Sequence, residues 1–224
     1  MSFESVASRY DRWYLSPEGR YMDAAESELF LKLVEPSAGQ KLLEVGCGTG
    51  HNIVFFQGLD LEVTGLEPSP SMLEIATGKC GQEAMLCSGD ASRLGFADNS
   101  FDIVAIITAL EFMADPAAAL AEAFRVSRRV VYLGILNKIS ILGISRRFGS
   151  WLSHKSIYCR ARFYTIREIE KIVKETAPGA SLRWESALFF PWGWHSCFQR
   201  VDRLLSFREN PFGAFLGVCI TKPE

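Results

Sequence analysis

The sequence lacks the features of a membrane or exported protein. Nowhere do about 18 apolar residues follow one another without a charge, the length that a membrane-spanning helix needs. The N-terminus, MSFESVASRYDRWY, has no apolar segment of the kind found in an export signal. A basic excess is missing too, because 24 Lys and Arg face 26 Asp and Glu, so we expect no nucleic-acid partner. The sequence favours a cytoplasmic protein.

Cysteine pairs and histidine clusters are also absent. The six cysteines include no CxxC pair, and none of the three histidines stands near a cysteine at ligand spacing. We therefore expect reduced thiols, no disulfide framework and no metal site. Hydrophobic residues make up 48% of the chain and charged residues 22%, which is typical of a globular protein. The length of 224 residues favours one α/β domain.

What the sequence does contain is an alternation of short apolar segments and helical stretches. After a helical segment over 2–35, strands are predicted at 41–45, 62–66, 84–87, 101–108, 129–136, 182–190 and 214–221. Helices are predicted from about residues 52 and 71, over 116–126, and from residue 165. This alternation favours a mainly parallel sheet covered on both faces. The strand at 101–108 is apolar throughout and is expected to lie mid-sheet.

Two of these helices carry sequence signals for their first turn. Asp115 stands directly before Pro116, as an N-cap does before a proline at the first helical position. Thr165 is followed three residues later by Glu168, the spacing of a capping box. Helix starts at 116 and 166 are therefore predicted.

A glycine-rich turn closes the first strand, in the stretch KLLEVGCGTG. Glycines there allow backbone NH groups and a helix N-terminus to approach a ligand without interference from side chains. Gly46, Gly48 and Gly50 give the spacing GxGxG, whereas the dinucleotide fingerprint GxGxxG would place a glycine where His51 stands. Taken alone, the turn is a weak signal, because a tight strand-to-helix connection also explains it.

Acidic residues end the next two strands. Glu67 follows VTGL about twenty residues beyond the glycine loop, where a carboxylate can accept hydrogen bonds from both hydroxyls of an unphosphorylated ribose. Asp90 ends the third strand in the stretch CSGDA, where it can accept from an adenine amino group. Together with the glycine loop, these positions favour a nucleoside-containing ligand.

Four successive motifs resemble those of the class I S-adenosylmethionine-dependent methyltransferases, in particular the type 11 (UbiE-like) group: EVGCGTG, GLEPSPSMLEIA, GDASRLGFADNSFDIV and ITALEFMADPAAALAEAFRV. The resemblance runs from about Leu42 to Val126. It implies a three-layer α/β/α sandwich with a seven-stranded, mostly parallel Rossmann-like sheet whose last strand is antiparallel. Within one domain over 1–224, we expect a helical cap at 1–36, a cofactor-binding core at 37–136, and long acceptor-side insertions at 137–163, after strand 5, and at 191–213, between strands 6 and 7.

The resemblance implies S-adenosylmethionine as cofactor and S-adenosylhomocysteine as its product. The N-terminal SVASRYDRWYLSPEGR also resembles a segment that closes over the cofactor in such enzymes, although packing against the core explains its tryptophan equally well. The implied cofactor residues are Tyr10 and Trp13 in that segment; Gly46, Cys47, Gly48 and Gly50 at the methionine part, with Glu44 supporting its amino group; Glu67 at the ribose; Pro68, Ser69 and Met72 beside ribose and adenine; Asp90 and Ala91 at the adenine edge; and Thr108, Ala109 and Leu110 on the methyl-donor side.

No catalytic residue is assigned from the sequence. Methyl transfer from a sulfonium is an in-line displacement that alignment alone promotes. Candidates for removing a proton from the acceptor are His154, His195 and Glu111, but packing or surface roles explain each one more simply. Many relatives have a histidine where Glu111 and Phe112 stand here, so a base is not carried over from the family.

The two insertions are the expected site of acceptor choice. They contain aromatic residues such as Trp151 in the first and Trp192 and Trp194 in the second. Such a cover favours a small apolar or aromatic methyl acceptor. Burial of their own apolar stripe, a dimer contact, or a peripheral membrane contact through 191–213 are alternatives. The oligomeric state stays open between monomer and homodimer.

Two other functions are compatible with a Rossmann-like sheet. One is an NAD-dependent oxidoreductase, which the GxGxG spacing, Asp90 and the absence of a Tyr-x-x-x-Lys pair disfavour. The other is a non-catalytic module that binds S-adenosylmethionine, because methyltransferases need no distinctive catalytic residue.

Overall fold

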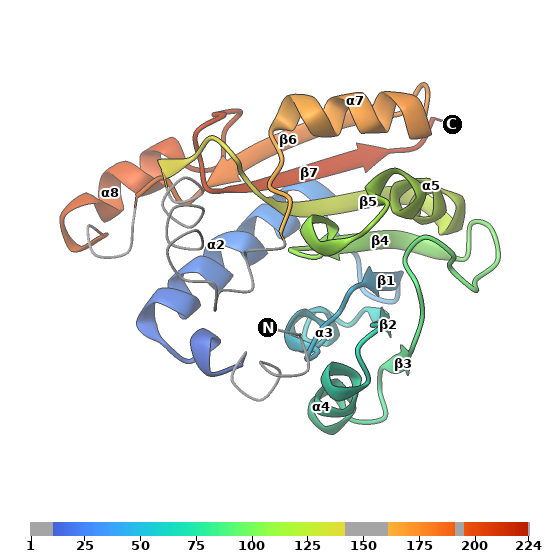
Figure 1. Cartoon of the computed structure of the whole chain (residues 1–224). Helices are drawn as coiled ribbons and strands as arrows, with labels where there is room; N and C mark the ends of the chain where they lie inside the picture. The colour runs from blue at the N-terminus through green and yellow to red at the C-terminus, as the bar shows by residue number, and fades with distance from the viewer. Residues whose placement is uncertain (1–10, 142–160, 191–194, 224) are drawn as a thin grey trace.

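The structure is a computed structural model that describes residues 11–141, 161–190 and 195–223, with side chains from residue 200 onward in the last range. Within these residues seven strands form a mixed sheet in the order β3-β2-β1-β4-β5-β7-β6 (Figure 1). The strands are β1 (Lys41–Val45), β2 (Glu62–Leu66), β3 (Met85–Cys87), β4 (Phe101–Ile107), β5 (Ser127–Leu136), β6 (Ser181–Ala187) and β7 (Phe215–Thr221).

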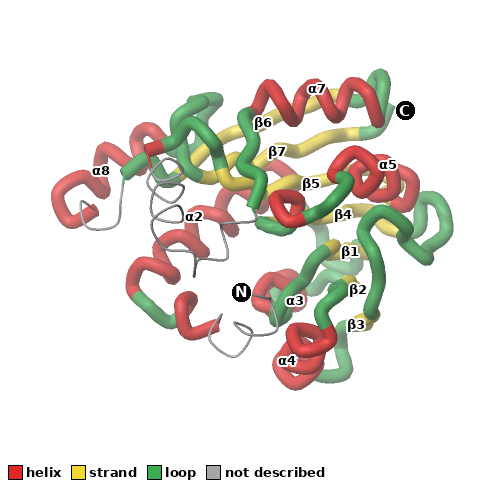
Figure 2. The backbone as a smooth tube through the Cα atoms, viewed as in Figure 1, coloured by secondary structure: helices red, strands yellow, loops and turns green. Residues whose placement is uncertain are grey.

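Helices cover both faces of this sheet (Figure 2). Neighbouring side chains on one strand show the two layers, because Leu43 packs in a core cluster with residues of α5 and α7, whereas Leu42 packs with residues of α2 and α3. The three-layer sandwich is therefore confirmed. The helices are α2 (Pro17–Val34), α3 (His51–Gln57), α4 (Pro70–Cys80), α5 (Pro116–Val126), α7 (Ile166–Thr176) and α8 (His195–Leu205), with the 3-10 helix η1 (Leu110–Phe112).

The strand order places the ligand-binding edge of the sheet. β1, β2, β3, β4 and β5 run parallel, while β7 is antiparallel to both β5 and β6. β4 is the middle strand of the seven, as the apolar pattern predicted. The chain leaves β1 toward β2 and β3 and then returns to β4, so the order reverses between β1 and β4. In open α/β sheets, ligands bind outside the carboxyl ends of the strands at such a reversal.

Both predicted helix starts are confirmed. The Asp115 side chain accepts a hydrogen bond from the NH of Ala118, and α5 begins at Pro116. Thr165 and Glu168 form both bonds of the capping box that starts α7. In each case a side chain satisfies a backbone NH that has no partner inside the helix.

The fifth strand begins two residues earlier than predicted, because α5 runs directly into it at Ser127. The Lys222 ammonium donates to the carbonyls of Phe124 and Ser127 on either side of this junction, at 3.0 and 2.9 Å. The register with β4 shifts between Phe101 and Ile103.

The prediction for the sixth strand was too long at its end. β6 ends at Ala187, because Leu188 has a positive φ of 67° that breaks an extended strand. The next two backbone NH groups, of Phe189 and Phe190, turn to the buried carboxylate of Asp202 in α8 at 2.7 and 3.2 Å. Asp202 also accepts from the Tyr21 hydroxyl of α2 at 2.6 Å. This carboxylate therefore fastens α8 to both β6 and α2.

The N-terminal helical segment is divided rather than continuous. A helical turn at 11–14 ends before Ser16, whose extended backbone and side-chain bond to the Gly19 NH start α2. Pro17 occupies the first turn of α2, and the residue before a proline is disfavoured in a helix. None of the helices in the described ranges is long and apolar enough to cross a membrane.

Candidate cofactor and acceptor site

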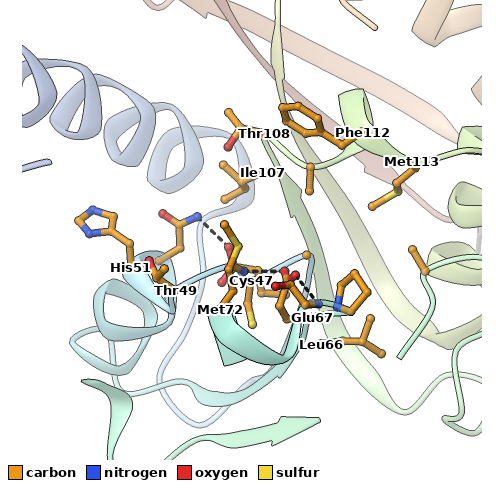
Figure 3. Close-up of a pocket in the computed structure, with 18 of the residues that line it drawn as sticks. Cys47, Thr49, His51, Leu66, Glu67, Met72, Ile107, Thr108, Phe112 and Met113 are labelled. Carbon is orange, nitrogen blue, oxygen red and sulfur yellow. Dashed lines mark hydrogen bonds between the residues drawn. The ribbon is translucent and has the colours of Figure 1, made fainter. Parts of the chain in front are cut away.

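A cavity of about 1180 Å³ opens at the carboxyl ends of the parallel strands (Figure 3). Its walls come from the N-terminal segment and α2, the glycine loop, the loop after β2, the turn after β3, and the ends of β4 and β5. The lining residues are Trp13, Tyr14, Glu18, Glu26, Glu44, Gly46, Cys47, Gly48, Thr49, His51, Asn52, Leu66, Glu67, Pro68, Ser69, Met72, Ser88, Gly89, Asp90, Ala91, Ser92, Ile107, Thr108, Ala109, Phe112, Met113, Ala114, Asp115, Ala119 and Leu136.

The glycine loop needs glycine for two physical reasons. Gly46, Gly48 and Gly50 all have positive φ, at 79°, 55° and 76°, a region that costs other residues free energy. A Cβ on Gly46 would also lie 2.6 Å from the Ala109 Cβ, in the segment after β4. The loop therefore passes close against the neighbouring strand end.

Glu67 holds the glycine loop in place. One carboxylate oxygen accepts from the Gly48 NH and the other from the Ser69 NH, each at 2.9 Å (Figure 3). The residue is 6% exposed. Burial raises the pKa of Glu67, and the two backbone donors oppose that effect. The acidic residue directly after β2 thus lines the cavity and also connects two of its loops.

Glu44, which lines the same cavity, has an unsatisfied side-chain oxygen. Its side chain is 1% exposed, and Oε1 accepts from the Asn52 amide at 2.7 Å. Oε2 has no hydrogen-bond partner. Burial, reinforced by the nearby negative charge of Glu67, raises the pKa of Glu44 to about 8, although the Asn52 bond opposes this. A buried carboxylate without a partner is costly unless a ligand satisfies it.

Asp90 lies at the open end of the cavity. Its Oδ1 accepts from the backbone NH and the hydroxyl of Ser92, at 2.9 and 2.8 Å. These two bonds lower the pKa of the Asp90 carboxyl. Ala91 lines the cavity beside it. Asp90 is therefore an ionised acceptor at the rim.

The opposite wall is mainly apolar. Ile107 and Thr108 at the end of β4 face the cavity together with Phe112 and Met113 of the following turn (Figure 3), and Leu136 at the end of β5 completes this side. The cavity thus joins a polar region beside β1, β2 and β3 to an apolar region beside β4 and β5.

The N-terminal segment is fastened to the glycine loop by an acidic residue that the sequence analysis did not single out. Asp11 accepts from the Thr49 hydroxyl at 2.6 Å and pairs with the Lys79 ammonium of α4 at 2.7 Å. Asp11 belongs to the YDRWY stretch, so the sequence contained a signal for this contact. Trp13, from the same stretch, lines the cavity and is 38% exposed.

A second contact between the N-terminal region and the end of the glycine loop involves His51, which the sequence did not indicate as a site residue. Its Nε2 lies 2.7 Å from Asp23 Oδ1 in α2, and the ring of Tyr14 stacks on the imidazole with centroids 3.6 Å apart. Both rings line the cavity. His51 was noticeable in the sequence only as the side chain standing where a dinucleotide fingerprint would have glycine.

Two predicted contacts do not line the cavity. Gly50 starts α3 and faces Cys80 and Ala76 of α4, where a Cβ would come within 2.6 Å of the Cys80 sulfur. Leu110 is fully buried in the core cluster that contains α5 and α7. Both residues lie behind the cavity wall. Tyr10 lies outside the described residues.

Among the candidates for a general base, Glu111 is the one whose side chain the structure describes, and it does not line the cavity. His154 and the side chain of His195 fall outside the described residues. Glu111 is 1% exposed, and its Oε1 accepts from the Leu136 NH at 2.6 Å, while Oε2 has no partner. Burial raises the pKa of Glu111 to about 7, against the opposing effect of the Leu136 bond. Glu111 therefore braces the segment after β4 against the end of β5.

Known proteins share this architecture. A family model described as a methyltransferase domain matches residues 43–133. A solved protein of Thermotoga maritima, described as an S-adenosylmethionine-dependent methyltransferase and possible histamine N-methyltransferase, is 27% identical, with a TM-score of 0.78 over 99% of this chain and 98% of that one.

Two curated relatives match in sequence. A demethylmenaquinone methyltransferase of Renibacterium salmoninarum is 32% identical over 130 residues, which are 56% of this chain and 52% of that enzyme. An uncharacterized protein of Methanocaldococcus jannaschii is 29% identical over 175 residues, 77% of this chain and 78% of that protein. The chain thus spans about half the length of the first relative and most of the second.

The strand order, the glycine loop tied to Glu67, and these matches agree with one another. The matched segment is a methyltransferase domain, the fold is that of S-adenosylmethionine-dependent methyltransferases, and S-adenosylmethionine is the cofactor.

Proposed function

We propose that this enzyme transfers the methyl group of S-adenosylmethionine to a small molecule with an apolar or aromatic body. The observation that carries the proposal is the continuity of one cavity of about 1180 Å³ from the Glu67 and Asp90 region to the apolar wall at Ile107 and Leu136. Pockets for a single small molecule usually measure about 300–1,000 Å³. A cavity of this size has room for a cofactor and an acceptor side by side.

The residues present fit the cofactor. The unsatisfied Oε2 of buried Glu44 suits the positively charged amino group of a methionine. Glu67 uses each oxygen for one backbone bond, and since each carboxylate oxygen can accept two bonds, both keep capacity for ribose hydroxyls. Asp90 remains an ionised acceptor at the rim for the adenine edge. The other expected contacts that line the cavity are Trp13, Gly46, Cys47, Gly48, Pro68, Ser69, Met72, Ala91, Thr108 and Ala109.

The acceptor region lies beyond Thr108 on the apolar wall. Two described contacts support a role of the insertions there. The Asn137 amide, at the start of the first insertion, donates to the carbonyls of Pro211 and Gly213 at the end of the second, each at 2.7 Å. These bonds join both insertions at the carboxyl end of β5, next to Leu136 in the cavity wall. We propose that the segments 137–163 and 191–213 together cover the acceptor.

The bound cofactor supplies an electrophilic methyl group on a sulfonium. The protein's own contribution is alignment. Gly46 packs against Ala109 and the loop is tied to Glu67, so the methionine side of the cavity has one fixed shape. The apolar side chains of Ile107, Phe112 and Leu136 keep water from that region. In-line displacement needs such positioning rather than an acid or base.

The proposal is tested by binding and turnover. Calorimetric titration with S-adenosylmethionine and with NAD comes first, and we expect binding of the former alone. The protein is then incubated with S-adenosylmethionine and a panel of small aromatic alcohols, amines, thiols and carboxylates, and S-adenosylhomocysteine is measured. Acceptor-dependent product supports the proposal, whereas cofactor binding without turnover on any acceptor class favours a non-catalytic module. Binding of NAD alone contradicts it.

A further inference from the structure

The described part of the cavity wall is rich in negative charge and poor in positive charge. Among these residues it contains no lysine or arginine, and His51 is the one basic side chain. The carboxylates on the same wall are Glu18, Glu26, Glu44, Glu67, Asp90 and Asp115. S-adenosylmethionine carries two positive groups, a sulfonium and an ammonium, and one negative group, the methionine carboxylate. The carboxylates suit the first two, but the third needs a donor.

His51 is held in one orientation at this wall. Its Nε2 is engaged by Asp23 at 2.7 Å, and Tyr14 stacks on one face of the ring with an interplanar angle of 15°. Nδ1 has no hydrogen-bond partner among the described residues. With Asp23 facing one nitrogen, an imidazolium would offer its other NH as a charge-assisted donor.

The position of His51 along the chain also fits. The ammonium and carboxylate of methionine are attached to one carbon, so the groups that bind them must be neighbours in space. Glu44 is hydrogen-bonded to Asn52, and Asn52 is the residue after His51 at the start of α3. His51, Asn52 and Glu44 all line the cavity, so a donor for the carboxylate and the acceptor for the amino group lie on the same wall.

We infer that His51, oriented by Asp23, binds the methionine carboxylate of S-adenosylmethionine. The inference rests on the placement of the cofactor's amino group at Glu44 proposed above. It explains why a side chain stands where a dinucleotide fingerprint has glycine, because here the ligand presents a carboxylate rather than a pyrophosphate. It also gives the contact between α2 and the glycine loop a purpose in cofactor recognition. His51 thereby becomes a binding residue and Asp23 its positioning residue.

The test compares two ligands that differ only in the carboxylate. Affinities for S-adenosylmethionine and decarboxylated S-adenosylmethionine are measured by calorimetry on wild type, His51→Gln and Asp23→Asn. We expect His51→Gln to weaken binding of the intact cofactor about tenfold to a hundredfold, the worth of a hydrogen bond to a charged group. Binding of the decarboxylated ligand should change less than about threefold by the same scale. Asp23→Asn should show the same selectivity with a smaller loss.

Lys79→Gln is the matched control. It removes the ion pair to Asp11 that also fastens the N-terminal segment, but Lys79 is not among the lining residues. Its effect should be equal for both ligands. If His51→Gln loses the same affinity for both ligands, the inference is overturned and His51 is a packing residue. An unchanged affinity of His51→Gln for the intact cofactor would overturn it as well. If His51→Gln does not fold, as judged by thermal melting, the ligand selectivity of Asp23→Asn decides. A wild-type protein that binds neither ligand would contradict the proposed function instead.

Discussion

The Gly48 NH donates to the carboxylate of Glu67 at 2.9 Å, so the residue directly after β2 fastens the loop that follows β1. The other oxygen of Glu67 accepts from Ser69 at 2.9 Å, in the loop that leads into α4. One carboxylate thus fixes two loops of the cofactor cavity. The side chain that we propose to bind the ribose therefore also holds these two loops.

Because Glu67 has both roles, its substitutions should weaken cofactor binding to different degrees. Glu67→Ala should weaken S-adenosylmethionine binding by about 1.5–3 kcal/mol for each lost bond to a charged group, and it also removes the acceptors for two backbone donors. Glu67→Gln keeps one acceptor oxygen and should lose less. Calorimetric titration gives the affinities. Glu62→Ala, at the exposed start of the same strand, is the control and should bind as wild type does. Unchanged affinity in Glu67→Ala would remove the residue from the site.

The glycine loop offers a second test with a close match. Gly46 and Gly39 have φ of 79° and 77°, but a Cβ meets Ala109 at 2.6 Å in the first and nothing within 4 Å in the second. Gly39→Ala should cost about 1–2 kcal/mol of unfolding free energy and leave cofactor binding intact. Gly46→Ala should lose more stability and weaken binding about tenfold or more, which corresponds to about 1.4 kcal/mol. Urea melts and calorimetry measure both, and equal behaviour of the two variants argues against close packing at Gly46.

Glu44 predicts a pH dependence of stability. Its pKa of about 8, against the ordinary 4.5, means that the folded protein keeps a proton that the unfolded chain has lost. Stability should therefore fall as pH rises from about 4.5 to 8, by at most about 1.4 kcal/mol per pH unit from this group. Glu44→Gln, which resembles the protonated form, should be less sensitive to pH in urea melts between pH 5 and 8.5. A slope identical to wild type contradicts the assignment.

The same carboxyl links cofactor binding to proton release. An ammonium group favours ionised Glu44, so binding below pH 8 should expel a proton and affinity should increase toward that pH. Calorimetry at pH 7 in phosphate and in Tris separates the effect, because the two buffers take up protons with different enthalpies. Glu44→Gln should abolish the difference between buffers, and a wild-type protein without such a difference would remove Glu44 from the amino-group site.

Glu111 is expected to affect stability in two ways that can be measured separately, through its hydrogen bond to Leu136 and through its protonation. Glu111→Ala leaves the buried Leu136 NH without its acceptor and should cost about 1–3 kcal/mol. Glu111→Gln keeps an oxygen for that NH. Because the pKa of Glu111 is raised from 4.5 to about 7, its stabilising protonated form is lost as pH rises through that range. The Gln variant should therefore gain stability relative to wild type toward pH 8 in denaturant melts, and a gain only at low pH contradicts this.

Local patterns were sufficient for the elements and for much of the site. Asp115 and Thr165 start helices because their side chains satisfy neighbouring NH groups, an interaction that spans only three residues. The unbroken apolar pattern of β4 indicated directly that this strand is buried on both faces. Glu67 and Asp90 could be placed at the cavity because parallel strands end at one edge of the sheet. These inferences need only short-range chemistry and a rule of topology.

Contacts between distant segments were not predictable in this way. Asp202 looks like an exposed helix residue, yet it is 1% exposed and accepts from Tyr21 and from Phe189. The same long-range contact accompanies the early end of β6, because the NH of Phe189 donates to Asp202 and not to a neighbouring strand.

The sequence by itself determined the strands of the sheet and the glycine loop, because each is encoded in a short segment, and its four motifs indicated the cofactor through their resemblance to methyltransferases. Only the tertiary structure decided that Asp23 meets His51 and that Gly50 and Leu110 lie behind the cavity wall. The direction in which a side chain faces depends on how α2, α3 and α4 pack on the sheet, and packing joins residues that no local spacing relates.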